Sequence, residues 1–257
     1  MDPIATGVGP GELRVDEVGD GPRVVLVHGG VAPGFGAFET QLPLADRWHL
    51  VAPHRLGYEG SPDVDEDWSK DAPLIAELLD QGAHLLGASY GGTVAMLAAQ
   101  QRPGAVRSLT LVEPAAISLA LDDPVVAAFD RDTRAALTGS PGPAETLTRL
   151  FGLIEPSTTW PDPLPDELVE VGRRLQRSRP PQDAAFDVEA LRCTGFPIVV
   201  ITGGARKPFE AIARAIERQL DGRHVLVVGA RHGCQHDDRF NRIVEDVWQD
   251  AEAAAAR

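Results

Sequence analysis

The chain has 257 residues, of which 43% are hydrophobic and 24% are charged, as is usual for a globular protein with one sizeable core. Its formal net charge of −14 argues against nucleic acid or an anionic membrane as the partner, because both attract basic surfaces. The start "MDPIATGVGPGELRV" is neither basic nor apolar, and no segment approaches the roughly 18 apolar residues of a membrane span. We therefore expect a cytoplasmic protein.

Short apolar runs alternate with helical patterns along most of the chain. The runs are almost continuously apolar, as in strands that are buried on both faces of a parallel sheet. They lie at 23–28, 49–53, 83–88, 108–113, 197–203 and 224–229. The helical patterns lie at 69–81, 90–101, 208–220 and 238–255. This alternation predicts an α/β fold with a doubly wound, mostly parallel sheet.

Residues 115–190 interrupt this alternation with several helix-like stretches that prolines separate. One stretch begins with Asp123 as its N-cap and Pro124 in its first turn. A long insertion at the carboxyl edge of the strands, where α/β proteins bind ligands, is typical of a lid, and a merely stabilising excursion is the alternative. We expect a core formed by 1–114 and 191–257, with a helical cap over 115–190.

The strongest chemical motif is GASYG at 87–91, which fits the pattern G-x-S-x-G between a predicted strand and a predicted helix. The sharp turn of this motif lifts the Ser89 hydroxyl out of the sheet edge and toward a helix N-terminus. The helix dipole and the free N–H groups there favour developing negative charge. We therefore predict that Ser89 is a nucleophile, and the alternative is a purely structural turn.

A second motif, HGG at 28–30, follows the first buried strand. Glycines allow the backbone to approach a ligand closely. We predict that the N–H of Gly30, or that of Val31, binds an oxyanion together with the N–H of Tyr90, the residue after the nucleophile. His28 is expected to support this loop rather than to act as a base.

A serine nucleophile needs a base within hydrogen-bond reach. The loop after the last predicted strand carries two histidines, His232 and His236. His232 lies closer to the end of that strand and is therefore better placed to reach the sheet edge. We predict that His232 is the base and that His236 has a role in the loop or in capping the last helix.

Four motifs together resemble the α/β-hydrolase-fold superfamily, in its cap-bearing, esterase-like and lipase-like branch. In the family's order, they are HGG at 28–30, APHRLGYEGSP at 52–62, GASYGG at 87–92 and GARHGCQHDDRFN at 229–241. The resemblance covers roughly 20–116 and 196–250 and implies an eight-stranded core. Because no sequence pattern for the first strand is evident, we expect that strand to be trimmed.

The acid of the predicted triad is missing from the family's usual place, a turn after the penultimate strand. Here the turn is GGARKP at 203–208, and Lys207 stands at the acid's position. A lysine cannot accept the imidazole N–H. Glu210 lies slightly further on, where capping the helix is the simpler interpretation. Asp237 and Asp238 follow the histidine too closely and start a helix, where acids are favoured by the dipole.

Glu113 is the remaining candidate, at the end of the strand that follows the nucleophile's helix. The resemblance places this strand beside that of Ser89, at about 4.8 Å. Some members of the superfamily hold their acid here, including certain dehalogenases and a fungal lactonase of resorcylic acid macrolides. We therefore predict Glu113 as the acid that orients His232.

These residues predict a serine hydrolase that cleaves a carboxylic ester or lactone through an acyl-enzyme. Acyl transfer, cofactor-free C–C bond hydrolysis in secondary metabolism and non-catalytic ligand binding are the alternatives. No cofactor or metal is expected, because no cluster has ligand spacing and GASYGG lacks the lysine of a phosphate loop. We expect an apolar small-molecule substrate in a pocket lined by Val31, Phe151 and Trp160.

Overall fold

Eight strands form one sheet in the structure, a computed structural model that describes residues 3–139 and 142–256. The order across the sheet is β1-β2-β4-β3-β5-β6-β7-β8. Neighbouring strands from β4 to β8 are parallel, and the two pairs that involve β2 are antiparallel. The predicted doubly wound, mostly parallel sheet is therefore confirmed. The strands are β1 (Ala5–Val8), β2 (Arg14–Val18), β3 (Arg23–Val27), β4 (His49–Pro53), β5 (Ala83–Ala88), β6 (Val106–Val112), β7 (Ile198–Thr202) and β8 (Arg223–Leu226).

The sheet begins with a strand that the sequence does not reveal. In the antiparallel pair of β1 with β2, Ala5 lies opposite Glu17 and Val8 lies opposite Arg14. All four residues of β1 are exposed, so the strand lacks the apolar pattern by which buried strands are recognised. The expectation that the first strand is trimmed is therefore wrong.

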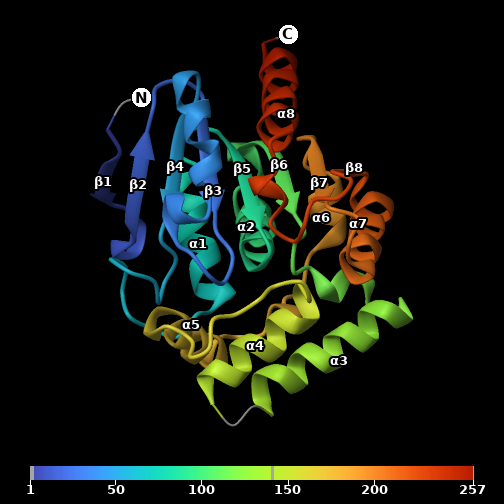
Figure 1. Cartoon of the computed structure of the whole chain (residues 1–257). Helices are drawn as coiled ribbons and strands as arrows, with labels where there is room; N and C mark the ends of the chain where they lie inside the picture. The colour runs from blue at the N-terminus through green and yellow to red at the C-terminus, as the bar shows by residue number, and fades with distance from the viewer. Residues whose placement is uncertain (1–2, 140–141, 257) are drawn as a thin grey trace.

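Helices cover both faces of the sheet (Figure 1). Helices α1, α2 and α7 pack on one face, and α8 packs on the other together with the 3-10 helix η3. Alternate residues of β3 divide between the two cores: Val25 and Val27 face the first, and Val24 and Leu26 face the second. The helices of these layers are α1 (Trp68–Leu78), α2 (Tyr90–Gln101), α6 (Val188–Arg192), α7 (Lys207–Leu220) and α8 (Phe240–Ala255). Short 3-10 helices are η1 (Pro10–Glu12), η2 (Gly34–Gly36), η3 (Glu39–Asp46), η4 (Pro103–Ala105), η5 (Ile117–Ala120), η6 (Pro181–Asp183) and η7 (Cys234–His236).

Three helices of the segment 115–190 lie together at one end of the sheet (Figure 1). They are α3 (Pro124–Thr138), α4 (Pro143–Ile154) and α5 (Asp166–Arg177). The Asp123 side chain accepts a hydrogen bond from the Val125 N–H at 2.8 Å, so it is the N-cap of α3 as predicted. These helices share a small apolar core of their own, formed by Ala136, Leu147, Leu150, Val171 and Leu175. None of the helices within the described residues is long and apolar enough to cross a membrane.

Candidate active site

Ser89 lies in a strained turn between β5 and α2, with φ 52° and ψ −120°. A positive φ is unusual for a residue with a side chain and costs about 1–3 kcal/mol. The turn is possible because its neighbours are glycines: a Cβ on Gly91 would lie 2.2 Å from the Val27 carbonyl oxygen, and a Cβ on Gly87 would lie 2.4 Å from the Gly91 oxygen. The G-x-S-x-G spacing is therefore a steric requirement of this turn, and it exposes the Ser89 hydroxyl.

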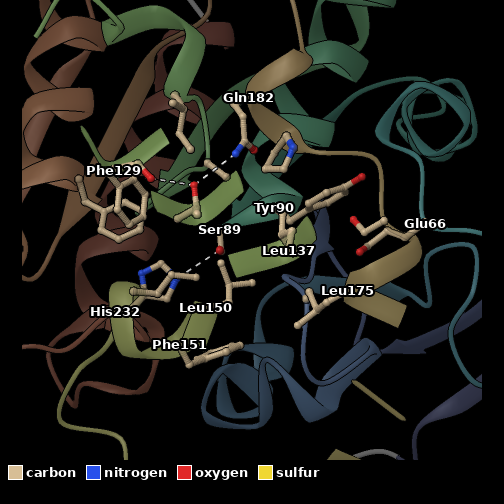
Figure 2. A pocket seen from close by; sticks show the side chains of 18 residues that line it. Glu66, Ser89, Tyr90, Phe129, Leu137, Leu150, Phe151, Leu175, Gln182 and His232 are labelled. Carbon is tan, nitrogen blue, oxygen red and sulfur yellow. Dashed lines mark hydrogen bonds between the residues drawn. The ribbon is translucent and has the colours of Figure 1, made fainter. Parts of the chain in front are cut away.

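A chain of hydrogen bonds joins the predicted nucleophile, base and acid. Ser89 Oγ lies 3.1 Å from His232 Nε2, as Figure 2 shows, and His232 Nδ1 lies 2.7 Å from Glu113 Oε2. An ionised carboxylate can only accept hydrogen bonds, so the proton of the neutral imidazole is on Nδ1. Nε2 is then free to accept the hydroxyl proton of Ser89. The structure thus brings together the three residues that the sequence analysis selected.

Glu113 is held at its position by both its backbone and its side chain. It directly follows β6, with φ 36°, and its N–H donates to the Ile201 carbonyl oxygen at 2.9 Å. Its side chain is fully buried, and Oε1 accepts the N–H of Gly203 at 2.9 Å. A buried carboxylate without partners would be strongly destabilising, but here each oxygen has a donor, from Gly203 or from His232.

Glu210 and Asp237, two of the other carboxylates that the sequence offered as the acid, are engaged elsewhere. Glu210 accepts the N–H of Gly204 at 3.1 Å and so ties the first turn of α7 to the turn after β7. Asp237 binds the side chain of Arg239 at 2.7 Å, and this hydrogen bond helps to lower its pKa to about 2. Lys207 is exposed and is the first residue of α7. In the described part of the chain, no hydrogen bond or ion pair joins any of these residues to His232.

A second glutamate fixes the backbone of the histidine loop. Glu155 directly follows α4, and its Oε2 accepts the N–H of His232 at 3.0 Å. Its Oε1 lies 3.6 Å from Arg231 Nε. Partial burial opposes ionisation of Glu155, but the hydrogen bonds from Ser157 and from His232 hold its pKa below the ordinary value. Glu155 could not be identified from the sequence, because nothing near it marks a partner 77 residues away.

The HGG loop runs beside Ser89. A Cβ on Gly29 would lie 3.3 Å from Ser89 Cβ, so the loop passes as close as glycine allows. Gly30 and Tyr90 border the same cavity as Ser89. The Tyr90 hydroxyl accepts the Trp68 N–H at 3.0 Å, so the side chain is anchored away from the nucleophile. Backbone groups of Gly30 and Tyr90 thus remain candidates for binding an oxyanion.

Arg55 is fully buried and organises this loop. Its guanidinium donates to the carbonyl oxygens of His28 at 3.1 Å and Gly29 at 2.8 Å. Two carboxylates balance its charge: Glu66 at 2.5 Å and Asp71 at 3.0 Å. Arg55 lies within the family motif at 52–62, but no feature of the sequence indicates its role.

His28 supports the same loop, as predicted. Its Nε2 accepts the N–H of Arg55 at 3.0 Å, and its Nδ1 lies 2.8 Å from the Gly29 carbonyl oxygen. Burial, together with the nearby Arg55 charge, lowers the pKa of His28 well below its ordinary value. A neutral imidazole with both nitrogens engaged is a structural residue rather than a base.

A narrow cavity of about 90 Å³ lies beside Ser89 and His232. Figure 2 shows side chains of the core and of the segment 115–190 around it. Most are apolar, and they include Ile117, Phe129, Leu137, Leu150, Phe151 and Leu175. Because both parts of the chain form the wall, any molecule in this cavity is enclosed between them.

Two of the three predicted pocket residues do not border this cavity. Phe151 does, but Val31 and Trp160 are absent from its described lining. Both pack instead against the apolar core that α3, α4 and α5 share, and the Trp160 ring meets that of Phe151 edge to face at 5.6 Å. Of the three predicted pocket residues, the described lining of this cavity therefore includes Phe151 alone, and Val31 and Trp160 belong to the neighbouring apolar cluster.

The described residues contain no group of three or more His, Cys, Asp or Glu side chains arranged to hold a metal ion. The acids and histidines described in this section are instead paired with one another, with arginine side chains or with backbone groups. Ser89, His232 and Glu113 have the side-chain chemistry for nucleophilic attack and proton transfer.

A family model described as the alpha/beta hydrolase family matches residues 24–245. This chain belongs to the alpha/beta hydrolase family. A curated relative, a pimeloyl-[acyl-carrier protein] methyl ester esterase of Methylococcus capsulatus, is 39% identical over 103 residues. That match covers 39% of this chain and 40% of the relative, so it spans less than half of either protein.

Solved structures share the fold of this chain over nearly its whole length. A meta-cleavage product hydrolase of Pseudomonas fluorescens has a TM-score of 0.68 and 18% identity, over 96% of this chain and 98% of that chain. A putative aryl esterase of Burkholderia cenocepacia has a TM-score of 0.67 and 19% identity, over 98% and 100% of the two chains. At these identities the likeness concerns the fold alone.

Proposed function

We propose that this protein is a serine hydrolase that cleaves a small carboxylic ester or lactone through an acyl-enzyme intermediate. The observation that carries the proposal is the continuous hydrogen-bonded chain from Ser89 through His232 to the buried Glu113. It supplies a nucleophile, a base and an orienting acid. The partial likeness to a methyl ester esterase also supports an ester as the substrate.

In the proposed reaction, His232 Nε2 removes the Ser89 proton while Ser89 Oγ attacks the substrate carbonyl carbon. Glu113 keeps the imidazole in the Nδ1–H tautomer and stabilises the imidazolium that forms. The backbone N–H groups of Gly30 and Tyr90 are proposed to bind the oxyanion. His232 then protonates the leaving alcohol and activates a water molecule, which releases the acid and restores Ser89.

The segment 115–190 is proposed to act as the cap of this enzyme, on the core formed by 1–114 and 191–257. Its helices contribute Phe129, Leu150 and Leu175 to the cavity wall. An apolar wall favours an apolar acyl or alcohol group, because burying apolar surface stabilises the complex. A small apolar ester or lactone is therefore the proposed substrate class.

The proposal is tested with Ser89→Ala and the matched control Ser118→Ala. The Ser118 hydroxyl donates to the Ala184 carbonyl oxygen at 2.7 Å and lies outside the cavity lining. Wild-type protein should react with a fluorophosphonate probe and hydrolyse short p-nitrophenyl esters. Ser89→Ala should abolish labelling and lower kcat by roughly 10⁶-fold, whereas Ser118→Ala should retain both activities.

A panel of esters and lactones of graded acyl size, with and without an added alcohol acceptor, separates hydrolysis from acyl transfer. Free acid as the product in the presence of the acceptor supports a hydrolase, and transfer to the acceptor supports a transferase. Wild-type protein that neither reacts with the probe nor turns over any member of the panel would refute the proposed function.

A further inference from the structure

The cavity beside Ser89 has a polar part that the proposed reaction does not use. Glu66 contributes to its wall, although its side chain is completely buried. Its Oε1 accepts two hydrogen bonds, from Arg55 Nη2 at 2.5 Å and from the Tyr58 hydroxyl at 2.9 Å. Its Oε2 is buried and has no hydrogen-bond partner among the described residues. A carboxylate oxygen in this state is a strong acceptor in the wall of a mostly apolar cavity.

Gln182 brings a second acceptor into the same wall. Its side chain is buried, and its Nε2 donates to Thr133 Oγ1 at 3.3 Å. The Thr133 hydroxyl proton is itself directed at the Phe129 carbonyl oxygen, at 2.8 Å, so Thr133 can only accept from Gln182. This fixes the orientation of the amide, and its Oε1 is left without a partner in the described part of the chain. Figure 2 shows Glu66 and Gln182 with Ser89 in one cavity.

The charge around Glu66 indicates what kind of donor fits. Arg55 lies between the carboxylates of Glu66 and Asp71, and the guanidinium of Arg174 lies 3.9 Å from the ring centroid of Tyr58. Two positive and two negative side chains therefore balance in this cluster. A cationic ligand would upset the balance, whereas a neutral hydroxyl or amide N–H would satisfy the free oxygen without adding charge.

We infer that the substrate carries a neutral hydrogen-bond donor, a hydroxyl or an amide N–H, which binds Glu66 Oε2, with Gln182 Oε1 as a second acceptor. This inference rests on the proposed function, and it narrows the substrate from an apolar ester to one with a polar group away from the scissile bond. Glu66 and Gln182 are then specificity-determining residues. An analogue without the donor leaves a buried acceptor unpaired and is disfavoured for that reason.

The test compares pairs of esters that differ only by a hydroxyl in place of a methyl group. One pair varies the acyl group, p-nitrophenyl 6-hydroxyhexanoate against p-nitrophenyl heptanoate. The other pair varies the alcohol, 2-hydroxyethyl hexanoate against propyl hexanoate. In at least one pair, wild-type protein should favour the hydroxyl ester by roughly 10- to 100-fold in kcat/KM, as expected for a hydrogen bond to a charged group. Ratios near one, or below one, in both pairs would overturn the inference and assign Glu66 Oε2 to a resident water.

Variants connect this preference to the two residues. Glu66→Gln and Gln182→Met should each reduce the ratio between the hydroxyl and methyl esters at least several-fold. Leu137→Met is the matched control, because it changes an apolar residue of the same wall and should leave the ratio unchanged. If Glu66→Gln does not fold because it disturbs Arg55, the inference is judged from two measurements: the ester ratio of the wild-type protein and the ester ratio of Gln182→Met. An unchanged ratio in every folded variant would contradict the assignment.

A binding measurement separates this inference from the proposed function. Ser89→Ala protein cannot form the acyl-enzyme, so isothermal titration calorimetry with the same ester pairs reports donor preference without turnover. Tighter binding of the hydroxyl ester, by roughly tenfold or more, supports the polar site even if wild-type protein hydrolyses no ester. Equal binding, combined with normal hydrolysis by wild-type protein, refutes the polar site and leaves the hydrolase proposal intact.

Discussion

The ends of two neighbouring strands, β6 and β7, differ in a way that explains the candidate site. The residue after β6 is Glu113, a buried carboxylate, whereas the turn after β7 begins with Gly203 and Gly204 and leads to Lys207. Both ends lie at the same edge of the sheet, because the strands are parallel. Glu113 reaches His232 from the β6 side, and the β7 turn contributes a backbone donor rather than an acid.

The β7 turn does not supply the predicted acid, but it still contacts it. The N–H of Gly203 donates to Glu113 Oε1, so this turn holds a carboxylate that another strand supplies. What the geometry requires is a desolvated carboxylate within reach of the His232 Nδ1–H, and either strand end can meet that requirement. The assignment of the acid to β6 is therefore a hypothesis about chemistry that mutations can test.

Among variants at the two strand ends, the largest effect is expected for Glu113→Gln. The amide keeps the shape of the side chain but presents an N–H or a weaker acceptor to His232 Nδ1, so the correct tautomer is lost. We expect kcat for ester hydrolysis to fall by roughly 10³- to 10⁴-fold. Steady-state kinetics on p-nitrophenyl esters, with circular dichroism to verify folding, measures this.

The matched control is Glu210→Gln, which changes the carboxylate nearest in sequence to the family's usual place for the acid. Its partners are the Gly204 N–H and His224, at 3.1 Å and 3.8 Å, so kcat should change by less than about threefold. A large loss in Glu210→Gln with little loss in Glu113→Gln would move the acid back to the β7 side.

An intermediate effect is expected for Gly203→Ala, which disturbs the β7 turn itself. The new Cβ would lie 2.0 Å from the Ala230 carbonyl oxygen, and this backbone belongs to the loop that carries His232. Displacement of either segment should destabilise the fold by about 1–3 kcal/mol and lower kcat by up to roughly 100-fold. Thermal unfolding and kinetics measure the two effects.

Gly104→Ala controls for the general effect of a methyl group on a glycine. A Cβ there has no neighbour within 4 Å among the described atoms, so stability and kcat should stay close to those of the wild type. Full activity of Gly203→Ala would mean that the β7 turn is not needed to hold Glu113.

The smallest effect is expected for Lys207→Ala. This side chain is exposed at the start of α7, although its sequence position is where the family usually has the acid. We expect kcat within about twofold and stability within about 0.5 kcal/mol of the wild-type values. A loss of more than tenfold in kcat would contradict this expectation and would indicate that Lys207 in the β7 turn has a chemical role.

Much of the fold could be predicted from the sequence because buried parallel strands have a strong local signal. The runs 49–53 and 83–88 match β4 and β5 residue for residue. By contrast, β1 was missed, because an exposed edge strand buries no side chains and so has no apolar pattern. The G-x-S-x-G turn was recognisable for a steric reason, namely that Gly87 and Gly91 have no room for a Cβ.

Outside the motifs of the predicted triad, side-chain partners that are distant in sequence could not be predicted. Glu155 reaches His232 across 77 residues, and Arg55 joins two loop carbonyls to two buried carboxylates. The sequence also did not reveal which apolar residues line the cavity. Trp160 packs against the ring of Phe151, and only Phe151 of these two is in the described lining. Hydropathy identifies such residues as apolar but does not tell which layer they occupy.

The sequence by itself determined the six parallel strands from β3 to β8, the G-x-S-x-G turn and the set of residues able to act as base and acid, because these depend on local patterns and on the chemistry of each side chain. Only the tertiary structure decided that Glu113, rather than Glu210, lies within hydrogen-bond reach of His232. It also decided that Glu66 and Gln182 give an apolar cavity two free acceptors. Both features depend on which strand ends and loops lie close together. Packing across the whole sheet determines these positions.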